Sequence, residues 1–193
     1  MIFLKKVTEK KDLKYFVMFP FKLYKGSKYW VPPIINQEIN NFNEDLNPNL
    51  KDSSVELFLA LEEKKVVGRI AVIINWFEVK KQKTNKIRFG WFDFIDNYDV
   101  SKKLLEKVTE IGKANKLEYM EGPMGFSNLD KVGVLTSGFD VIGTMITTYN
   151  YDYYKNHYEK HGLKVEKTFH EKTFMFKEID LDYYEKMSRI VKK

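Results

Sequence analysis

The sequence has no cysteine, and this absence removes several kinds of chemistry at once. Disulfide bonds, thiolate nucleophiles and thiolate metal ligands are all excluded for this chain of 193 residues. Long apolar runs are also missing, since the stretch at residues 70–74 is far too short to cross a bilayer. The N-terminal stretch lacks the small-residue cleavage site that ends a signal peptide. We therefore predict a cytoplasmic location and no membrane partner.

Arginine is scarce, occurring only at Arg69, Arg88 and Arg189, although the net charge is +6. The positive charge comes almost entirely from lysines that alternate with Glu and Asp, as on a solvated protein surface. Proteins that bind nucleic acid usually favour arginine, whose guanidinium forms paired hydrogen bonds with phosphate and guanine. The charge is therefore explained by surface composition, and we predict no nucleic-acid partner.

The residues that are present, 44% hydrophobic and 16% aromatic, fit one folded domain with a sizeable core. Apolar runs and alternation predict strands, and periodic apolar spacing predicts helices. The predicted strands are residues 2–7, 55–62, 66–75, 87–95 and 116–121, followed by a strand-rich segment at 165–179. The predicted helices are residues 12–24, 34–42, 100–115, 152–160 and 181–193. Asp12 should cap the first helix, and Pro20 should kink or break it.

The order of these elements predicts a mixed central sheet. Strands 55–62, 66–75 and 87–95 follow one another along the chain, so we expect them to pair antiparallel. The helix at 100–115 separates strand 87–95 from strand 116–121, so these two strands should lie parallel and adjacent. The predicted fold class is α/β, or α+β in the sense of a mixed sheet, with helices flanking the central sheet.

Residues 156–163, NHYEKHGL, resemble the late helix motif Tyr-Glu-Lys-x-Gly-Phe of the GNAT acyltransferases. Several longer runs are similar to those of a group of bacterial GNAT-like proteins classed as acetyltransferases. These runs are residues 24–33, 66–75, 87–96, 122–140 and 149–163. The resemblance covers nearly the whole chain and implies a GNAT-like acyl-CoA N-acyltransferase fold over residues 1–179. It also implies a C-terminal helix at 180–193 that leads toward a second domain, the chain being the N-terminal half of a longer protein.

The resemblance implies a reaction as well as a fold. An acyl group, expected to be acetyl, would pass from a coenzyme A thioester to an amine. Acetyl-CoA would be the cosubstrate, no metal would be needed, and the acceptor would be a small-molecule or peptide amine. A second GNAT-like domain or a second copy of the chain is the implied protein partner. Two alternatives stay open: a binding or scaffolding domain that has lost coenzyme A binding, and a transferase whose donor is bulkier or tethered to a carrier.

Two candidate catalytic residues follow from the resemblance. Tyr158 matches the tyrosine that protonates the departing thiolate of coenzyme A, and a phenol with a pKa of about 10 suits that role. Packing among the neighbouring tyrosines explains Tyr158 equally well. Asp93 matches acidic residues that take a proton from the amine in some of these enzymes. A strand-end carboxylate that faces solvent or pairs with a lysine is the simpler interpretation of Asp93.

The segment expected to bind coenzyme A lacks the glycines of the family's diphosphate loop. In such a loop, backbone amides approach the diphosphate at a helix N-terminus. Here the matching segment carries Asp96 and Asp99, whose carboxylates should repel a diphosphate. The residues to which the resemblance assigns coenzyme A binding are Phe94, Ile95, Asn97, Tyr98, Val100, Ser101 and Asn150. For Asn150, which approximates the asparagine that binds the pantetheine arm, the capping of a turn is an equal explanation.

The three histidines are His157, His161 and His170. His157 and His161 are spaced to share one helix face, but no acidic third ligand is placed convincingly beside them. We therefore predict a surface pair and no metal site.

Overall fold

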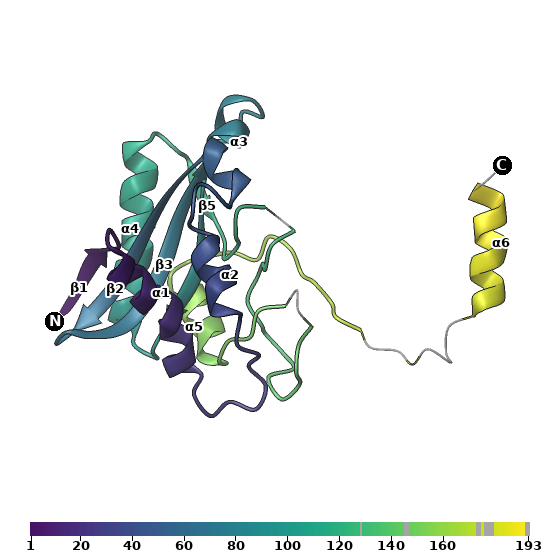
Figure 1. Ribbon diagram of the computed structural model, residues 1–193, viewed down its shortest axis with the longest axis horizontal. Helices are drawn as coiled ribbons and strands as arrows, with labels where there is room; N and C mark the ends of the chain where they lie inside the picture. Colours follow the sequence, from purple (N-terminus) through teal and green to yellow (C-terminus); the bar gives the residue numbers. More distant parts are fainter. Residues whose placement is uncertain (128, 145–146, 173–174, 176–179, 192–193) are drawn as a thin grey trace. The chain divides into compact units, whose positions relative to one another are not determined.

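The computed structural model describes residues 1–127, 129–144, 147–172, 175 and 180–191 (Figure 1). The chain divides into two units, Met1–Leu163 and Lys164–Lys193, and each is described by itself. The first unit holds the sheet and most of the helices, and every candidate site residue belongs to it.

The sheet has five strands in the order β1-β2-β3-β4-β5. They are β1 (Ile2–Lys6), β2 (Ser53–Glu62), β3 (Lys65–Asn75), β4 (Lys86–Phe94) and β5 (Tyr119–Glu121). Strands β1 to β4 pair antiparallel in sequence order, and β4 pairs parallel with β5, so both predicted pairings are confirmed. The β2–β3 turn contains no glycine, but Glu63 and Lys64 both have positive φ angles, as a tight two-residue hairpin turn requires.

Helices cover both faces of this sheet. The helices of the first unit are α1 (Lys10–Leu23), α2 (Ile35–Asn40), α3 (Trp76–Lys80), α4 (Tyr98–Ala114) and α5 (Tyr153–Lys160), with a 3-10 helix at Pro48–Asp52. The short helix α3 and the 3-10 helix were not predicted from the sequence. Helix α1 differs from the prediction in two ways, because it begins at Lys10 and continues past Pro20 to Leu23 without a break. Asp12 does not cap it: its carboxylate is buried and lies 2.7 Å from the Lys5 Nζ.

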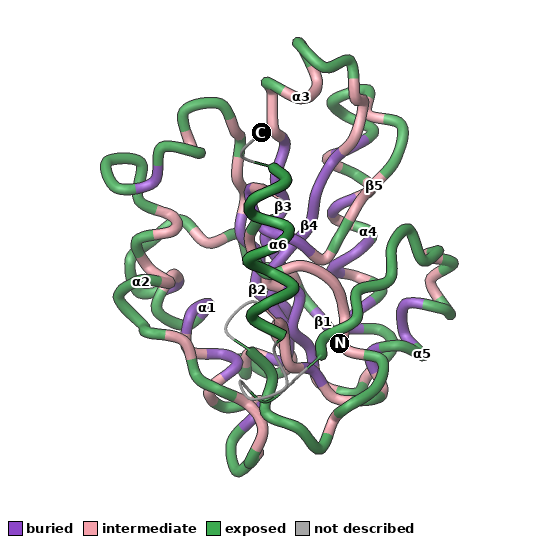
Figure 2. Tube along the Cα trace, turned by 90° about the vertical axis from the view of Figure 1, so that its right-hand side faces the viewer, coloured by how far each residue is buried: buried purple, intermediate pink, exposed green. Residues whose placement is uncertain are grey.

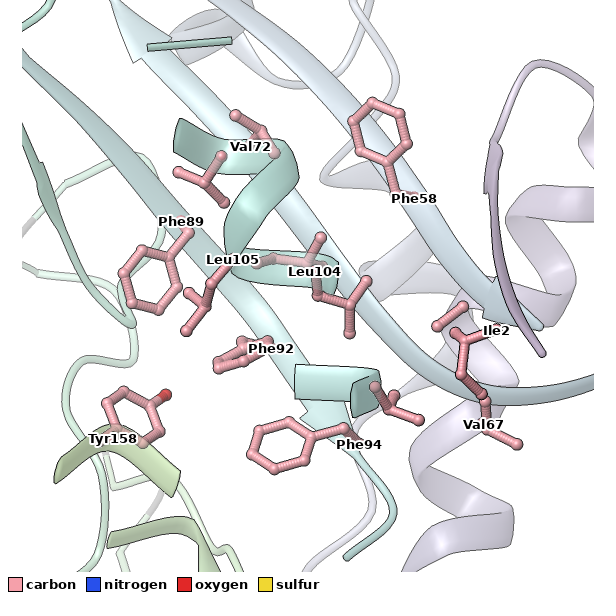
Figure 3. Close-up of a cluster of buried hydrophobic side chains, with 14 of the residues drawn as sticks. Ile2, Phe58, Val67, Val72, Phe89, Phe92, Phe94, Leu104, Leu105 and Tyr158 are labelled. Carbon is pink, nitrogen blue, oxygen red and sulfur yellow. The ribbon is translucent and has the colours of Figure 1, made fainter. Parts of the chain in front are cut away.

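The core lies on the two faces of the sheet, as the alternation of side chains along each strand requires. Helices α4 and α5 pack on one face against residues such as Phe58, Val72 and Phe89 (Figure 3). Helices α1 and α2 lie over the other face, where Leu57 and Leu59 are buried. The central strands are accordingly the most buried part of the first unit (Figure 2).

A bulge in β4 interrupts its pairing with β3. The register passes from Arg69↔Asp93 to Ala71↔Gly90, so β4 has one residue more than β3 at this point. Trp91 lies in the bulge with a φ angle of 45°, which is rare for a residue with a side chain. Its indole N–H donates to a carboxylate oxygen of Glu38 on α2 at 2.7 Å, and this contact helps to hold the strained residue.

The chain that follows β5 stays close to β4 for a few residues. Pairing of β5 with β4 covers three residue pairs and ends at Arg88↔Glu121. The Met124 N–H then donates to the Phe89 carbonyl at 2.9 Å. A Cβ atom on Gly90 would lie 2.2 Å from the Met124 carbonyl oxygen, so only glycine allows this close approach. The last residues of β4 extend past this contact.

The second unit contains helix α6 (Leu181–Val191), as predicted up to residue 191, while residues 192–193 lie outside the described part. The predicted strand-rich segment is wrong for residues 165–172, which form no strand. Val165 and Phe169 are 84% and 66% exposed, because an apolar alternation forms a strand only where a neighbouring strand pairs with it. Residues 173–174 and 176–179 lie outside the described part. Within that part, no helix combines the length and apolar character needed to cross a membrane.

Candidate functional site

The end of β4 is bound by two tyrosines of α5. The Phe94 N–H donates to the Tyr154 hydroxyl oxygen at 3.1 Å, and the Phe94 carbonyl accepts from the Tyr153 hydroxyl at 2.5 Å. β5 no longer pairs with β4 here, so side chains satisfy peptide groups that a strand would otherwise satisfy. Helix α5 is thereby fixed against the end of β4.

Tyr158 lies one helical turn after Tyr154, and its ring packs near Phe89 and Phe92 with centroids 6.4 and 5.8 Å apart (Figure 3). The residue is 9% exposed, and its hydroxyl is buried with no hydrogen-bond partner in the part of the chain that the structure describes. Burial, helped by the negative charge of Asp93, raises the pKa of Tyr158 well above the ordinary tyrosine value. The hydroxyl therefore keeps its proton at neutral pH and is a hydrogen-bond donor without an acceptor among the described residues.

Asp93 belongs to a buried hydrogen-bond network on β3, β4 and α1. The Arg69 Nε and Nη2 atoms both lie 2.7 Å from one carboxylate oxygen, and the Tyr24 hydroxyl donates to the other oxygen at 3.0 Å. The expectation of a solvent-facing or lysine-paired carboxylate is corrected here, because Asp93 is 8% exposed and its partner is an arginine. The pair is stable in the core because both charged groups have their hydrogen-bond partners.

Pro20 explains why Arg69 reaches α1. A proline has no N–H, so the Phe16 carbonyl four residues earlier loses its usual helical partner. The Arg69 Nη1 donates to that carbonyl at 2.8 Å. Helix α1 therefore continues through Pro20, and the network joins α1 to the sheet.

The network continues to α5 through a chain of hydrogen bonds whose protons all point toward Asp93. Because the Tyr24 hydroxyl donates its proton to Asp93, the Tyr154 hydroxyl, 3.0 Å away, must donate to Tyr24. The Tyr154 oxygen in turn accepts the N–H of Phe94. Burial and the charge of Asp93 raise the pKa of both tyrosines, so both hydroxyls stay protonated. A carboxylate on β4 is thus connected through two tyrosines to the backbone one residue further along the strand.

The N-terminus of α4, expected to bind the diphosphate, is already capped. The Asn97 side chain accepts the N–H of Asp99 at 2.9 Å, and the Val100 N–H donates to the Asn97 carbonyl. Val100 and Ser101 are fully buried, so their side chains face the core. The Ile95 N–H donates to Val67 of β3 at 3.0 Å. The first turn of the helix therefore offers fewer free amides to an anion than an uncapped helix would.

His157 of α5 and His161, directly after it, contact the same end of α4. His157 is buried, and its Nε2–H donates to the Asp96 carboxylate at 2.9 Å. The Ser101 hydroxyl lies 2.8 Å from His157 Nδ1 and 2.8 Å from His161 Nε2. The predicted surface pair is wrong for His157, because α5 packs onto the start of α4. Burial lowers the pKa of His161, with the charges of His157 and Lys102 acting in the same direction.

Tyr98 and Asn150 have structural partners of their own. The Tyr98 ring stacks on His161, with centroids 4.5 Å apart and planes inclined by 12°. The Asn150 side chain accepts the Leu135 N–H at 2.6 Å and donates to the Leu135 and Tyr151 carbonyls at 3.2 and 2.8 Å. Asn150 therefore fastens its loop in this structure. Two shallow hollows, of about 320 and 120 Å³, lie elsewhere, and Tyr158 lines neither. Across the described residues, no cluster of three His, Asp or Glu side chains could hold a metal ion.

Comparison with solved structures identifies the arrangement of strands and helices. A protein described as a predicted acetyltransferase from Clostridium acetobutylicum, solved with acetyl-CoA, matches with a TM-score of 0.53 and 14% identity, over 90% of this chain and 96% of that one. An aminoglycoside acetyltransferase from a soil metagenome matches with a TM-score of 0.51 and 14% identity, over 91% and 96%. A protein described as a transcriptional regulator from Bacillus halodurans matches with a TM-score of 0.55 and 14% identity, over 90% and 100%.

The chain has the GNAT acetyltransferase fold. No family model matches the sequence. Among curated proteins, YghO of Escherichia coli is 26% identical over 153 residues, which are 79% of this chain and 39% of YghO. The bacterial ceramide synthase of Caulobacter vibrioides is 28% identical over 132 residues, 67% of this chain and 34% of that protein. The chain thus spans little more than a third of the length of these relatives.

Within the GNAT fold, the structure brings the two predicted catalytic residues near the end of one strand. Asp93 is on β4, and Tyr158 lies over the same strand from α5. The sequence analysis missed Tyr24, Arg69, Tyr153 and Tyr154, which hold this region together. One signal could have found Arg69: it is a lone charge within the apolar strand VVGRIAVIIN, and a buried charge requires a buried partner.

Proposed function

We propose that this domain transfers an acyl group from a thioester to an amine. The observation that carries the proposal is the buried Tyr158 hydroxyl, which keeps its proton and has no acceptor among the described residues. Leaving such a group without a partner costs about 1–3 kcal/mol, so the position calls for an explanation, and a catalytic role is one. The GNAT fold and the match to the Tyr-Glu-Lys-x-Gly motif support the assignment of that hydroxyl to a departing thiolate.

The proposed step balances in protons. The amine nitrogen bonds to the thioester carbonyl carbon, and the carbon–sulfur bond breaks. The sulfur takes the proton of Tyr158, and the proton lost by the amine nitrogen restores the phenol. The raised pKa of Tyr158 is compatible with this role, because the apolar surroundings that disfavour a phenolate also raise the proton affinity of a thiolate beside it.

Asp93 is a weaker candidate for the base that first deprotonates the amine. Its carboxylate already accepts hydrogen bonds from Arg69 and Tyr24. We assign it instead, within this proposal, to positioning: through Tyr24 and Tyr154 it holds α5, and hence Tyr158, against β4. The amine would then arrive unprotonated from solution.

The residues present fit the thioester end of coenzyme A better than its diphosphate. In this proposal the Tyr158 hydroxyl would give its proton to the sulfur, whereas Asp96 and Asp99 flank a helix end at which the Asn97 side chain already accepts the Asp99 N–H. Acetyl-CoA is the first donor to test, since a solved protein of this fold contains it. A longer acyl chain or a donor tethered to a carrier would depend less on the diphosphate.

The acceptor is proposed to be a lipid-like amine. The Caulobacter relative is named a ceramide synthase, and ceramides form when the amine of a long-chain base is acylated. That relative is 28% identical over 132 residues, and a sphingoid base is therefore the first acceptor to test.

The absence of cysteine makes the assay direct. A thiol-reactive dye would report only released coenzyme A when the chain is mixed with acetyl-CoA or a long-chain acyl-CoA and either a polyamine or a sphingoid base. We expect amine-dependent thiol release that disappears in Tyr158→Phe. The proposal is wrong if no pair of substrates gives thiol release and calorimetry also detects no heat of acyl-CoA binding.

A second candidate is a GNAT-shaped binding domain without coenzyme A chemistry. The capped and acidic N-terminus of α4 favours it, as does the closure of that end by His157. It predicts no acyl-CoA binding by either the chain or its Tyr158→Phe variant.

A further inference from the structure

The segment that joins α1 to α2 exposes apolar side chains at the surface. Val31 and Ile34 are 58% and 63% exposed, and Ile35 is 37% exposed. Pro32 beside them is also exposed. Exposed apolar side chains that are grouped, as these are along the chain, are typical of interaction surfaces.

The same segment carries positive charge without compensating acids. No Asp or Glu occurs between Asp12 and Glu38. Lys22, Lys25 and Lys28 are exposed, and none of them forms an ion pair in the described structure. Most other surface lysines of the chain are interleaved with acids, so this stretch differs from the rest of the surface.

The segment is anchored rigidly behind its exposed residues. The Ser27 hydroxyl accepts the N–H groups of Tyr29 and Trp30, and the Trp30 ring lies 5.2 Å from Phe21 and 5.3 Å from Tyr24. Tyr24 is the residue that donates to Asp93. The exposed residues are therefore held in place next to the end of β4, where Figure 1 shows the segment as a loop at one end of the sheet.

We propose that residues 22–35 dock on an anionic phospholipid surface. The three lysines would bind phosphate headgroups, Trp30 would lie at the interface, and Val31, Ile34 and Ile35 would enter the outer acyl region. Lysines and exposed aliphatic groups together provide the two signals that reversible surface binding needs. This proposal departs from the sequence analysis, which predicted no membrane partner, because the exposure of these apolar residues is decided only by the fold. Vesicle binding is independent of the proposed acyl transfer.

Sedimentation with phosphatidylcholine vesicles, with and without phosphatidylglycerol, tests the proposal on the intact chain. We expect binding to the anionic vesicles that weakens with salt. Lys25→Gln/Lys28→Gln should bind roughly 25-fold more weakly, at about fivefold for each lysine. Its control is Lys10→Gln/Lys11→Gln, which removes the same charge from exposed positions at the other end of α1 and should bind as the unchanged chain does.

The apolar contribution has its own pair of variants. Ile34→Ser should weaken vesicle binding by roughly fivefold or more, because less apolar surface is removed from water. Ile34 is the N-cap of α2, where serine is favoured, so the fold should be kept. Phe77→Ser, which alters a residue of α3 that is 52% exposed, should have no effect. The proposal is overturned if the unchanged chain does not bind anionic vesicles at low salt. It is also overturned if the two lysine-pair variants weaken vesicle binding equally, or if Ile34→Ser binds vesicles as the unchanged chain does.

Discussion

Tyr154 and Tyr158 lie one turn apart on α5, yet among the described residues only Tyr154 has hydrogen-bond partners, Tyr24 and the Phe94 N–H. Removing the two hydroxyls should therefore have opposite effects. Tyr158→Phe should leave the free energy of unfolding unchanged or raise it by about 1 kcal/mol, since an unpaired buried hydroxyl is lost. Any acyl transfer should fall by roughly 10²–10⁴-fold, the usual effect of losing a general acid.

Tyr154→Phe is the matched control, because it removes the same atom from a satisfied position. It should lower the free energy of unfolding by about 1–3 kcal/mol. Chemical denaturation of both variants and a thiol-release assay check the pair. If Tyr158→Phe destabilises the fold as much as Tyr154→Phe does, the hydroxyl has a partner and the proposed acid role loses its basis.

The carboxylates at the start of α4 should weaken coenzyme A binding. Changing Asp96 and Asp99 to Asn removes two negative charges beside the helix N-terminus, where an anion would otherwise be favoured. We expect tighter binding, by about fivefold for each charge, in calorimetric titration. The gain should be larger at low salt, where charge repulsion is least screened.

Glu106→Gln/Glu110→Gln removes the same charge from exposed positions further along α4 and should leave coenzyme A binding unchanged. Tight binding by the unchanged chain that neither pair of substitutions alters would show that the aspartates do not repel the diphosphate.

The buried pair of Arg69 and Asp93 should be costly to break. Arg69→Met leaves a buried carboxylate without its cation and the Phe16 carbonyl without its donor, so we expect a loss of about 3–5 kcal/mol in unfolding free energy. Arg69→Met/Asp93→Asn should recover part of this loss, because no uncompensated charge remains.

The exposed pair of Lys102 and Glu106, 4.0 Å apart, provides the comparison. Lys102→Met should change the unfolding free energy by no more than about 0.5 kcal/mol. Equal losses at the two sites in urea titration would contradict the assignment of Arg69 to a buried network.

His161 should make stability fall in mild acid. Its pKa in the folded chain lies below the ordinary value of 6.5, chiefly because of burial. A depressed histidine pKa means that folding favours the neutral form, so its contribution is complete above pH 6.5 and is lost as the pH falls through the folded pKa. Thermal unfolding at a series of pH values should show this decline, and His161→Gln should reduce it.

His170→Gln alters an exposed histidine and should leave the pH profile unchanged. A profile of His161→Gln that coincides with that of the original chain would mean that other groups cause the acid sensitivity.

The sequence alone determined the sheet and its pairing. Apolar runs such as 66–75 and 87–95 and the periodic helix at 100–115 are local patterns, and the short connections leave few ways to arrange them. The place of Asp93 on a strand also followed, because residue 93 lies within the predicted strand 87–95, whereas the burial of the Tyr158 hydroxyl did not follow from the sequence. A local pattern failed at residues 165–172, where no neighbouring strand pairs with the alternation.

Only the tertiary structure decided which polar groups satisfy one another. The contact of Arg69 with both Asp93 and the Phe16 carbonyl joins residues 24 and 53 positions apart, and the bonds of α5 to Phe94 span about 60. Hydrogen bonds over such separations depend on how helices pack on the sheet, which no local pattern records. The same packing buried His157, left Tyr158 without a partner among the described residues and exposed Val31 and Ile34, because burial is a property of the assembled layers and not of a residue's type.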